Sequence, residues 1–176
     1  MREIHLSQDY VALVDDERYE SVMQFKWRAL VDRRKDGSIR NVYAVRVETL
    51  GGGTRKLVYL HRFLIGAIPG EHCDHINGDG LDNRMTNLRI CTNAENHRNQ
   101  RIRIGCSSKH KGVCWHKQRG KWQAEIKING MGRHLGLFSD ETDAARAYDV
   151  AAAELFGEFA RLNEYTQTAV DIHTAL

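Results

Sequence analysis

The sequence lacks an apolar run of about 18 residues, so we expect no membrane-spanning helix. Its first ten residues, MREIHLSQDY, lack the apolar stretch of a secretory signal, and none is expected. The four cysteines lack close CxxC spacing and are interpreted as reduced thiols of a cytosolic protein. With 28% charged residues and a mean hydropathy of -0.54, the chain has the composition of a polar, soluble protein.

The net charge of +3 hides an uneven distribution. Residues 98–134 hold ten Lys and Arg against one acid, a net charge of +9, whereas residues 135–160 hold one Arg against six acids, a net charge of −5. A basic surface beside an acidic one predicts a polyanion bound on one side only. A solvated charged face without a partner is the alternative, but aromatic residues and glycines alternate with the basic ones here.

The 176 residues suit one large domain or two small ones, and local patterns divide them into four regions. Residues 1–60 are predicted to form an N-terminal β-rich region, with strands and one helix alternating by hydrophobic period. Expected there are strands at 3–6, 11–14, 42–47 and 57–60, and a helix at 15–27. The further regions are 61–104, then after a polar linker 111–163, and a patternless tail, 164–176.

The segment HCDHINGDGLDNRMTNLRICTNAENHRN, residues 72–99, carries the most specific chemistry. Residues 73–76 and 87–91 are predicted to be two strands joined by a sharp, Gly- and Asn-rich turn. Thr92 then caps a helix, with Glu95 three residues later completing a capping box. The predicted strand–loop–strand–helix unit lets Asp74 and Asn96 face each other across a small gap.

The residue types in this unit suit phosphodiester hydrolysis. A hard divalent cation prefers oxygen ligands, which the Asp74 carboxylate and the Asn96 amide can supply beside water and DNA phosphate. His75 titrates near neutral pH and can take a proton from the attacking water. The Asn87 amide oxygen can accept a hydrogen bond from the N–H of the other ring nitrogen and so fix the tautomer. A bound cation stabilises charge on the scissile phosphate and the leaving oxygen.

Asp74, His75, Asn87 and Asn96 resemble the motif of the HNH endonuclease family, in its homing-endonuclease branch of phages and mobile introns. The resemblance covers residues 57–100, includes LHRFLIG at 60–66, and implies a ββα-metal fold. It implies that His75 is the general base, Asn87 its orienter, and Asp74 and Asn96 the ligands of Mg²⁺ or Mn²⁺.

Alternatives remain for several of these residues. Many members of the family have His where this chain has Asn96, and the adjacent His97 is an alternative ligand. His61 is interpreted as structural rather than catalytic. Singly, each motif residue could be an ordinary turn, cap or surface residue, but their joint spacing favours a nuclease. Two nearby cations, Arg89 and Arg98, are candidate phosphate contacts or solvated charges.

Residues 111–163 predict a three-stranded antiparallel sheet packed on one helix. The strands are expected at 112–116, 122–129 and 134–138, the middle one alternating cleanly between apolar and polar residues. The helix is expected from Ser139 or Asp140 to Phe156, with Gly157 as its C-terminal cap. Its apolar stripe is predicted to be Ala144, Tyr148, Ala151, Ala152 and Leu155. The other face of the sheet stays open and polar.

This region resembles the Apetala-type, or ethylene-response-factor, DNA-binding domain of plants, through KGV, GKWQAEI, LGLF, AARAYDVAAAELFG and the closing ARLN. The resemblance implies that the open face contacts DNA. Cys114 and His116 stand where the family commonly has Arg, so base preference is not transferable. Trp115 and Trp122 are expected inside first, and as stacking residues second. The candidate DNA contacts are Lys111, His116, Arg119, Glu125, Lys127, Arg133 and His134.

Together these patterns predict an α+β protein: a ββα-metal nuclease core with a β-rich extension, followed by a DNA-binding sheet. We expect a metal-dependent, site-specific endonuclease that acts on double-stranded DNA, as a monomer, in the cytoplasm of a bacterial or phage-infected cell. A DNA-binding transcriptional regulator with an inactive nuclease fold is the alternative. A protein acting on RNA is less favoured, because a sheet fits the wide groove of B-DNA better. A zinc site from Cys106, His110, Cys114 and His116 lacks a usual ligand spacing.

Overall fold

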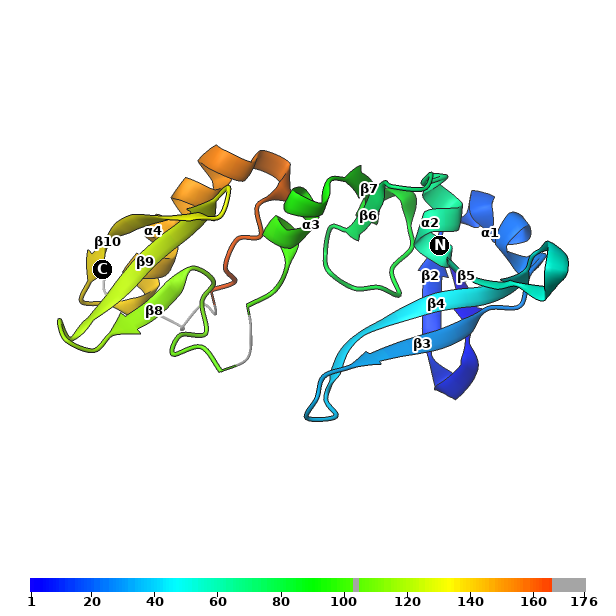
Figure 1. Ribbon diagram of the computed structural model, residues 1–176, viewed down its shortest axis with the longest axis horizontal. Helices are drawn as coiled ribbons and strands as arrows, with labels where there is room; N and C mark the ends of the chain where they lie inside the picture. Colours follow the sequence, from blue (N-terminus) through cyan, green and yellow to red (C-terminus); the bar gives the residue numbers. More distant parts are fainter. Residues whose placement is uncertain (103–104, 166–176) are drawn as a thin grey trace, which may run out of the picture. The chain divides into compact units, whose positions relative to one another are not determined.

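The computed structural model describes residues 1–102 and 105–165, which belong to two compact units, residues 1–99 and 100–176 (Figure 1). Each unit is built from small antiparallel sheets and few helices, as the sequence predicts. The predicted tail begins with Glu164 and Tyr165, and its remainder lies outside the described residues. Among the described helices none is both long and apolar enough to cross a membrane.

The first unit begins with an antiparallel pair, β1 (Arg2–His5) and β2 (Val11–Val14), followed by helix α1 (Asp16–Met23). A three-stranded antiparallel sheet then follows in the order β3-β4-β5. Its strands are β3 (Arg28–Arg33), β4 (Ile39–Thr49) and β5 (Arg55–Tyr59). The prediction that the first helix reaches residue 27 is wrong: α1 ends at Met23, and the indole of Trp27 donates to the carbonyl of Val22 at 2.9 Å.

Helix α2 (Leu60–Ile65) leads from the sheet to a hairpin of β6 (His72–His75) and β7 (Leu88–Cys91), followed by helix α3 (Asn93–Asn99). The predicted capping box is confirmed. The Thr92 amide donates to Glu95 Oε2 at 2.7 Å, and the Glu95 amide donates to Thr92 Oγ1 at 3.3 Å. Thr92 alone therefore connects the hairpin to α3, and the capping box fixes this connection.

The N-terminal strands and the hairpin region share one hydrophobic core. Ala12 and Val14 of β2 and Ala44 of β4 are buried in the same cluster as Leu60 and Leu88. Residues 1–60 thus form the wall against which the hairpin is packed, which fixes the position of its polar side chains.

The second unit has an antiparallel sheet in the order β10-β9-β8. Its strands are β8 (Val113–His116), β9 (Lys121–Ile128) and β10 (Met131–Phe138), and helix α4 (Glu141–Phe156) packs on one face. Asp140 caps α4 by accepting from the amides of Thr142 and Asp143. Gly157 at its C-terminal end has a φ of 52°. The predicted sheet, helix and caps are all present.

Two contacts explain the KGV and ARLN motifs of this unit. Gly112 has a φ of +78°, and a Cβ there would lie 1.9 Å from Cδ2 of Tyr148 on α4, so only glycine lets β8 begin so close to the helix. Asn163 accepts from the Lys111 amide at 2.6 Å and donates to the Lys111 carbonyl at 3.2 Å. The end of the unit is thereby bonded to its start.

The apolar stripe of α4 differs slightly from the prediction: Ala145 is buried, whereas Leu155 is 38% exposed. Trp115 also differs. Its register opposite Trp122 places it on the α4 side of the sheet, with ring centroids 5.0 Å apart, but at the sheet's end it stays 40% exposed.

Candidate functional site

The β6–β7 hairpin positions Asp74 and His75. Asp74 is paired in register with Arg89, and His75 with Leu88. Successive side chains of a strand point to opposite faces, so the acid and the imidazole lie on different sides of β6. Both are buried, at 7% and 5% exposure. A buried acid and a buried imidazole on adjacent residues form a site rather than two surface residues.

His75 lies in an aromatic environment. Its ring is 4.8 Å from that of His61, in an edge-on arrangement, and 6.1 Å from that of Tyr43. Burial lowers the pKa of His75, against a smaller opposing effect of Asn83. The imidazole is therefore neutral at pH 7 and able to accept a proton.

His61 lies on α2 and is itself buried. Burial, with the nearby His75, lowers its pKa to about 3, so it stays neutral at any pH at which a nuclease works. Its ring lies 5.3 Å from Tyr59 and 5.8 Å from Tyr43. These contacts make His61 part of the wall behind His75.

Asn87 does not orient His75, and this expectation is corrected. Asn87 Oδ1 accepts from the Asn77 amide at 3.0 Å, and Nδ2 donates to Asn77 Oδ1 at 3.0 Å and to the Asp82 carbonyl at 2.7 Å. Through these bonds the side chain of Asn87 holds the two ends of the 77–83 loop together. The residue next to the imidazole is Asn83, whose Oδ1 lies 3.5 Å from His75 Nε2 and which is 1% exposed.

The 77–83 loop is held from two sides. The Leu13 amide donates to the Leu81 carbonyl, and the Asn83 amide donates to the Leu13 carbonyl, each at 2.8 Å. On the other side the Gly80 amide donates to Asn41 Oδ1 at 3.1 Å. Asn83 thus reaches His75 from a loop fixed to both β2 and β4.

Asp74 is bonded to Arg89 and Asn99. Arg89 donates to Asp74 Oδ2 from Nη2 at 2.8 Å and from Nε at 3.2 Å, and Asn99 Nδ2 donates to the same oxygen at 2.9 Å. Arg89 was expected to contact phosphate or solvent; in this structure it forms a buried ion pair with Asp74. Asn99 Nδ2 also donates to the carbonyl of His75 at 3.0 Å, so it joins α3 to the end of β6.

The donor set fits a divalent cation of the oxygen-preferring kind. The expected ligands are one carboxylate oxygen and one amide oxygen, the type that such a cation prefers. The described residues contain no group of three or more His, Cys, Asp or Glu that could hold a metal ion. The side-chain amide of Asn99 is used in its bonds to Asp74 and to the His75 carbonyl. Asn96, one turn earlier, lies on the same side of α3. His97 is exposed and lies about 100° around the helix from Asn96. The ligand roles of Asp74 and Asn96 stay predictions.

The second unit presents an open polar face opposite α4. Register and alternation place His116, Glu125, Lys127 and His134 on this face, together with Cys114. Cys114, Lys127 and His134 are exposed, and Glu125 and His116 are half-buried. These candidate contacts are brought onto one surface; whether they bind DNA stays a prediction.

Other candidate contacts lie elsewhere. Arg119 is exposed in the β8–β9 turn, and half-buried Arg98 lies on α3. Arg133 pairs with Ile126, which places it on the α4 side rather than the open face. Lys111 precedes β8 and is half-buried, with Nζ donating to the Gln100 carbonyl at 2.8 Å; burial lowers its pKa to about 8. The register therefore does not group Arg133 or Lys111 with the open face.

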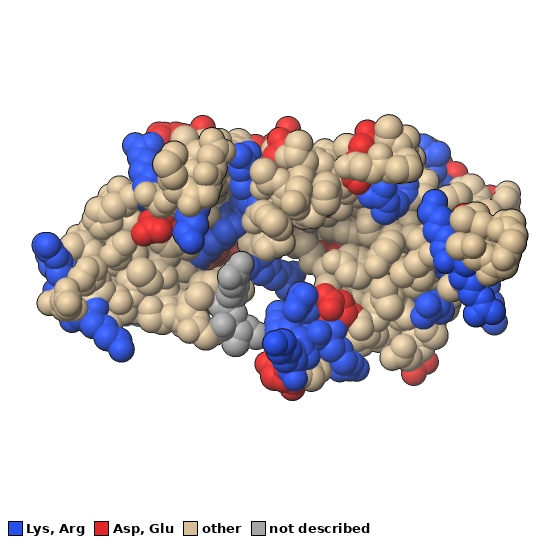
Figure 2. Space-filling model, in the orientation of Figure 1, with Lys and Arg blue, Asp and Glu red and all other residues tan. Residues whose placement is uncertain are grey.

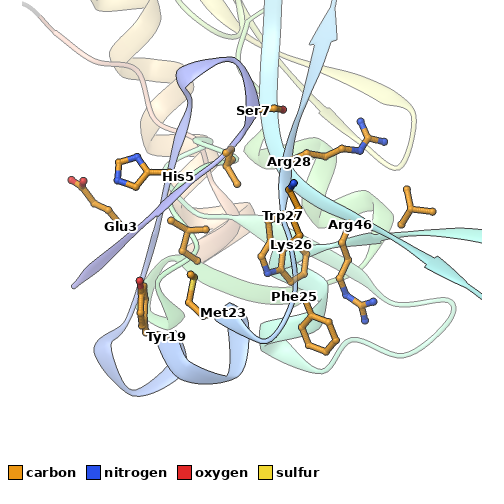
Figure 3. A pocket seen from close by; sticks show the side chains of 13 residues that line it. Glu3, His5, Ser7, Tyr19, Met23, Phe25, Lys26, Trp27, Arg28 and Arg46 are labelled. Carbon is orange, nitrogen blue, oxygen red and sulfur yellow. The ribbon is translucent and has the colours of Figure 1, made fainter.

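A pocket of about 590 Å³ lies in the first unit, away from His75, between β1, α1 and β4 (Figure 3). Arg46 lies at one side of it, with its guanidinium 4.2 Å from the ring of Phe25 and 3.2 Å from Glu48. In the described part of the chain, Arg46 Nε is the buried side-chain polar atom without a hydrogen-bond partner. A cation over an aromatic ring accounts for this arrangement as packing.

Comparisons with known proteins point to the HNH endonuclease family. A family model described as HNH endonuclease matches residues 59–98. An uncharacterized HNH endonuclease of Acanthamoeba polyphaga mimivirus is 35% identical over 111 residues, covering 60% of this chain and 57% of the relative. Protein 3.8 of Escherichia phage T7 is 32% identical over 97 residues, covering 54% of this chain and 79% of that protein.

Plant proteins match a smaller share of the chain. An AP2-like ethylene-responsive transcription factor of Oryza sativa is 45% identical over 53 residues, 29% of this chain and 8% of that protein. This chain therefore spans little more than half of the mimivirus relative and a small part of the plant factor.

Proposed function

The chain belongs to the HNH endonuclease family, and we propose that it is a metal-dependent, site-specific endonuclease that hydrolyses phosphodiester bonds in duplex DNA. The observation that carries this proposal is His75. It is buried, neutral because burial lowers its pKa, and next in sequence to a buried carboxylate. A general base must hold no proton before it takes one, and this imidazole meets that condition at pH 7.

In the proposed mechanism His75 takes a proton from the attacking water. With Nε2 protonated toward Asn83 Oδ1, Nδ1 is the nitrogen that accepts it. Mg²⁺ or Mn²⁺ would be held by Asp74 and Asn96, and when bound it stabilises negative charge on the phosphate and the leaving oxygen. Asn99 fixes Asp74 and the end of β6 relative to α3. Arg89 balances the charge of Asp74.

We further propose that the second unit binds the duplex through its open face, supported by the AP2-like relatives and by Lys127, His116 and His134, which the register places there. Contacts with phosphate would give affinity, and base contacts would give the position of the cut. One HNH unit has one cutting centre, so a monomer nicks one strand. The proposed location is the cytoplasm of a bacterial or phage-infected cell.

A DNA-binding regulator with an inactive nuclease fold is the second candidate, favoured by the similarity to plant transcription factors. Supercoiled plasmid incubated with the full chain in Mg²⁺, in Mn²⁺ and in EDTA separates the two. A nuclease converts the plasmid to nicked circles with either metal and shifts it without cutting in EDTA. Binding in all three conditions, with no conversion in Mg²⁺ or in Mn²⁺, would support the regulator and contradict the nuclease.

A further inference from the structure

The hairpin of β3 and β4 ends in a basic tip, residues 33–40, which we call the ribbon tip. Four cations lie in it, against the single acid Asp36. Figure 2 shows blue Lys and Arg side chains gathered at the far end of this hairpin. Apart from half-buried Arg34, every residue of the ribbon tip is exposed. The four cations are Arg33, Arg34, Lys35 and Arg40.

The ribbon tip has a defined conformation. The Arg34 amide donates to the Ser38 carbonyl at 2.8 Å, and Gly37, with a φ of 85°, closes the turn by donating to the Arg34 carbonyl at 3.0 Å. Asp36 Oδ1 accepts from the amide and hydroxyl of Ser38 at 2.9 and 2.6 Å. The acid of the turn is thus used internally. Arg33 donates to the Gly37 carbonyl at 3.0 Å and Arg34 to the Ile39 carbonyl at 2.8 Å, and Arg40 lies 3.4 Å from Asp32, so the arginines of the tip are held in an ordered turn.

The base of the hairpin is bonded to the loop that faces the general base. Asn41 Oδ1 accepts from the Gly80 amide at 3.1 Å, and Asn41 Nδ2 lies 3.5 Å from the Gly78 carbonyl. The same loop carries Asn83, which lies against His75. The path from the ribbon tip to the catalytic imidazole therefore runs through a single hairpin and one anchored loop within the same unit.

We propose that the β3–β4 hairpin inserts its ribbon tip into a groove of the duplex and thereby sets which phosphate reaches His75. A two-stranded antiparallel ribbon fits the B-DNA major groove, which is about 12 Å wide and about 8.5 Å deep. Four residues beyond Asn41 at about 3.3 Å each extend the ribbon by about 13 Å, enough to reach the groove floor. In that position the cations of the tip would face the phosphates of the groove walls. This inference rests on the proposed function, because it assumes a DNA substrate.

The test compares two triple variants of the full chain with equal loss of charge. The tip variant is R33Q/K35Q/R40Q. The control variant is R18Q/R55Q/K56Q, three exposed cations of the same unit, two of them on β5 opposite the other end of β4. Affinity for a fluorescent plasmid restriction fragment is measured by anisotropy in EDTA at several salt concentrations, and thermal melts verify that each variant is folded.

We expect the tip variant to bind about tenfold or more weakly, with the slope of log K against log salt reduced by about 0.9 for each lost phosphate contact. The control variant should stay close to wild type. Equal losses in both variants, or an unchanged affinity of the tip variant, would overturn the proposal. Plasmid nicking by wild type separates this result from the proposed function: wild type that binds but never cuts refutes the nuclease and leaves the ribbon comparison intact.

Discussion

His61 and His75 form a buried pair of imidazoles whose rings touch, and burial lowers the pKa of both. If either ring took up a proton in the folded state, the resulting positive charge would be buried without water around it, which is unfavourable. For His75 this provides a base that is neutral at pH 7. For His61 it creates a dependence of folding stability on pH.

The pH dependence has a definite sign. The pKa of His61 is about 3 in the folded chain and near its ordinary 6.5 when unfolded, so the unfolded chain binds more protons between these values. The free energy of unfolding should therefore fall as pH is lowered from 6.5 toward 3, by about 1.4 kcal/mol per pH unit for this residue. His61→Phe should make the fall shallower. Urea unfolding at pH 7 and pH 4.5 measures it, with Tyr59→Phe as the control for packing; an equal fall in His61→Phe and wild type would contradict the account.

Asp74 and His75 were singled out from the sequence because they occur together with Asn87 and Asn96 at a spacing that favours a nuclease, and their roles stay predictions. Asn83 and Asn99 were missed. The signal for Asn99 was present, since it stands three residues after Asn96 on one helix face. The sequence gives no comparable signal for Asn83. It is one of several Asn and Asp residues in a turn-rich loop, and only its tertiary contacts with Leu13 and His75 distinguish it. Asn87 was assigned the bond that Asn83 makes.

At the scale of elements, alternation and caps predicted most strands and both long helices, but β3 was missed. Its alternating Ala29 and Val31 were hidden by apolar positions at helical spacing that run on to Trp27 and continue the pattern of α1. The ring of Trp27 is 5.9 Å from Phe63 of α2, a contact from a distant segment. The period of the sequence alone cannot predict such packing. In the structure α1 ends at Met23 and Trp27 packs against α2.

The close approach of the 77–83 loop to β4 depends on Gly80. A Cβ there would lie 2.4 Å from the Val42 carbonyl oxygen and 2.7 Å from Cδ1 of Tyr43. Gly80→Ala should push the loop from β4 and misplace Asn83, lowering cleavage on the order of tenfold to a hundredfold. Single-turnover cleavage and a thermal melt measure this. Gly51→Ala, where a Cβ meets nothing within 4 Å, is the control; wild-type cleavage by Gly80→Ala would refute the role of this contact.

At the scale of the whole molecule, the chain joins a unit with a buried acid–imidazole pair to a unit with an open polar face. The basic segment, residues 98–134, could be identified from the sequence, because counting charges requires no knowledge of the fold. Which candidate contacts share a surface depends on register: Lys127 and His134 do, and Arg133 does not. We propose that the first unit cuts DNA and that the second supplies most of the affinity for it.

The most direct test of this account is single-turnover cleavage of plasmid DNA in Mg²⁺ by His75→Ala, with affinity measured separately in EDTA. Loss of a general base should slow cleavage by about a hundredfold to ten-thousandfold, while affinity stays within about twofold of wild type. His72→Ala, an exposed histidine of the same strand, should cut like wild type. Cleavage by His75→Ala at the wild-type rate would contradict the central claim.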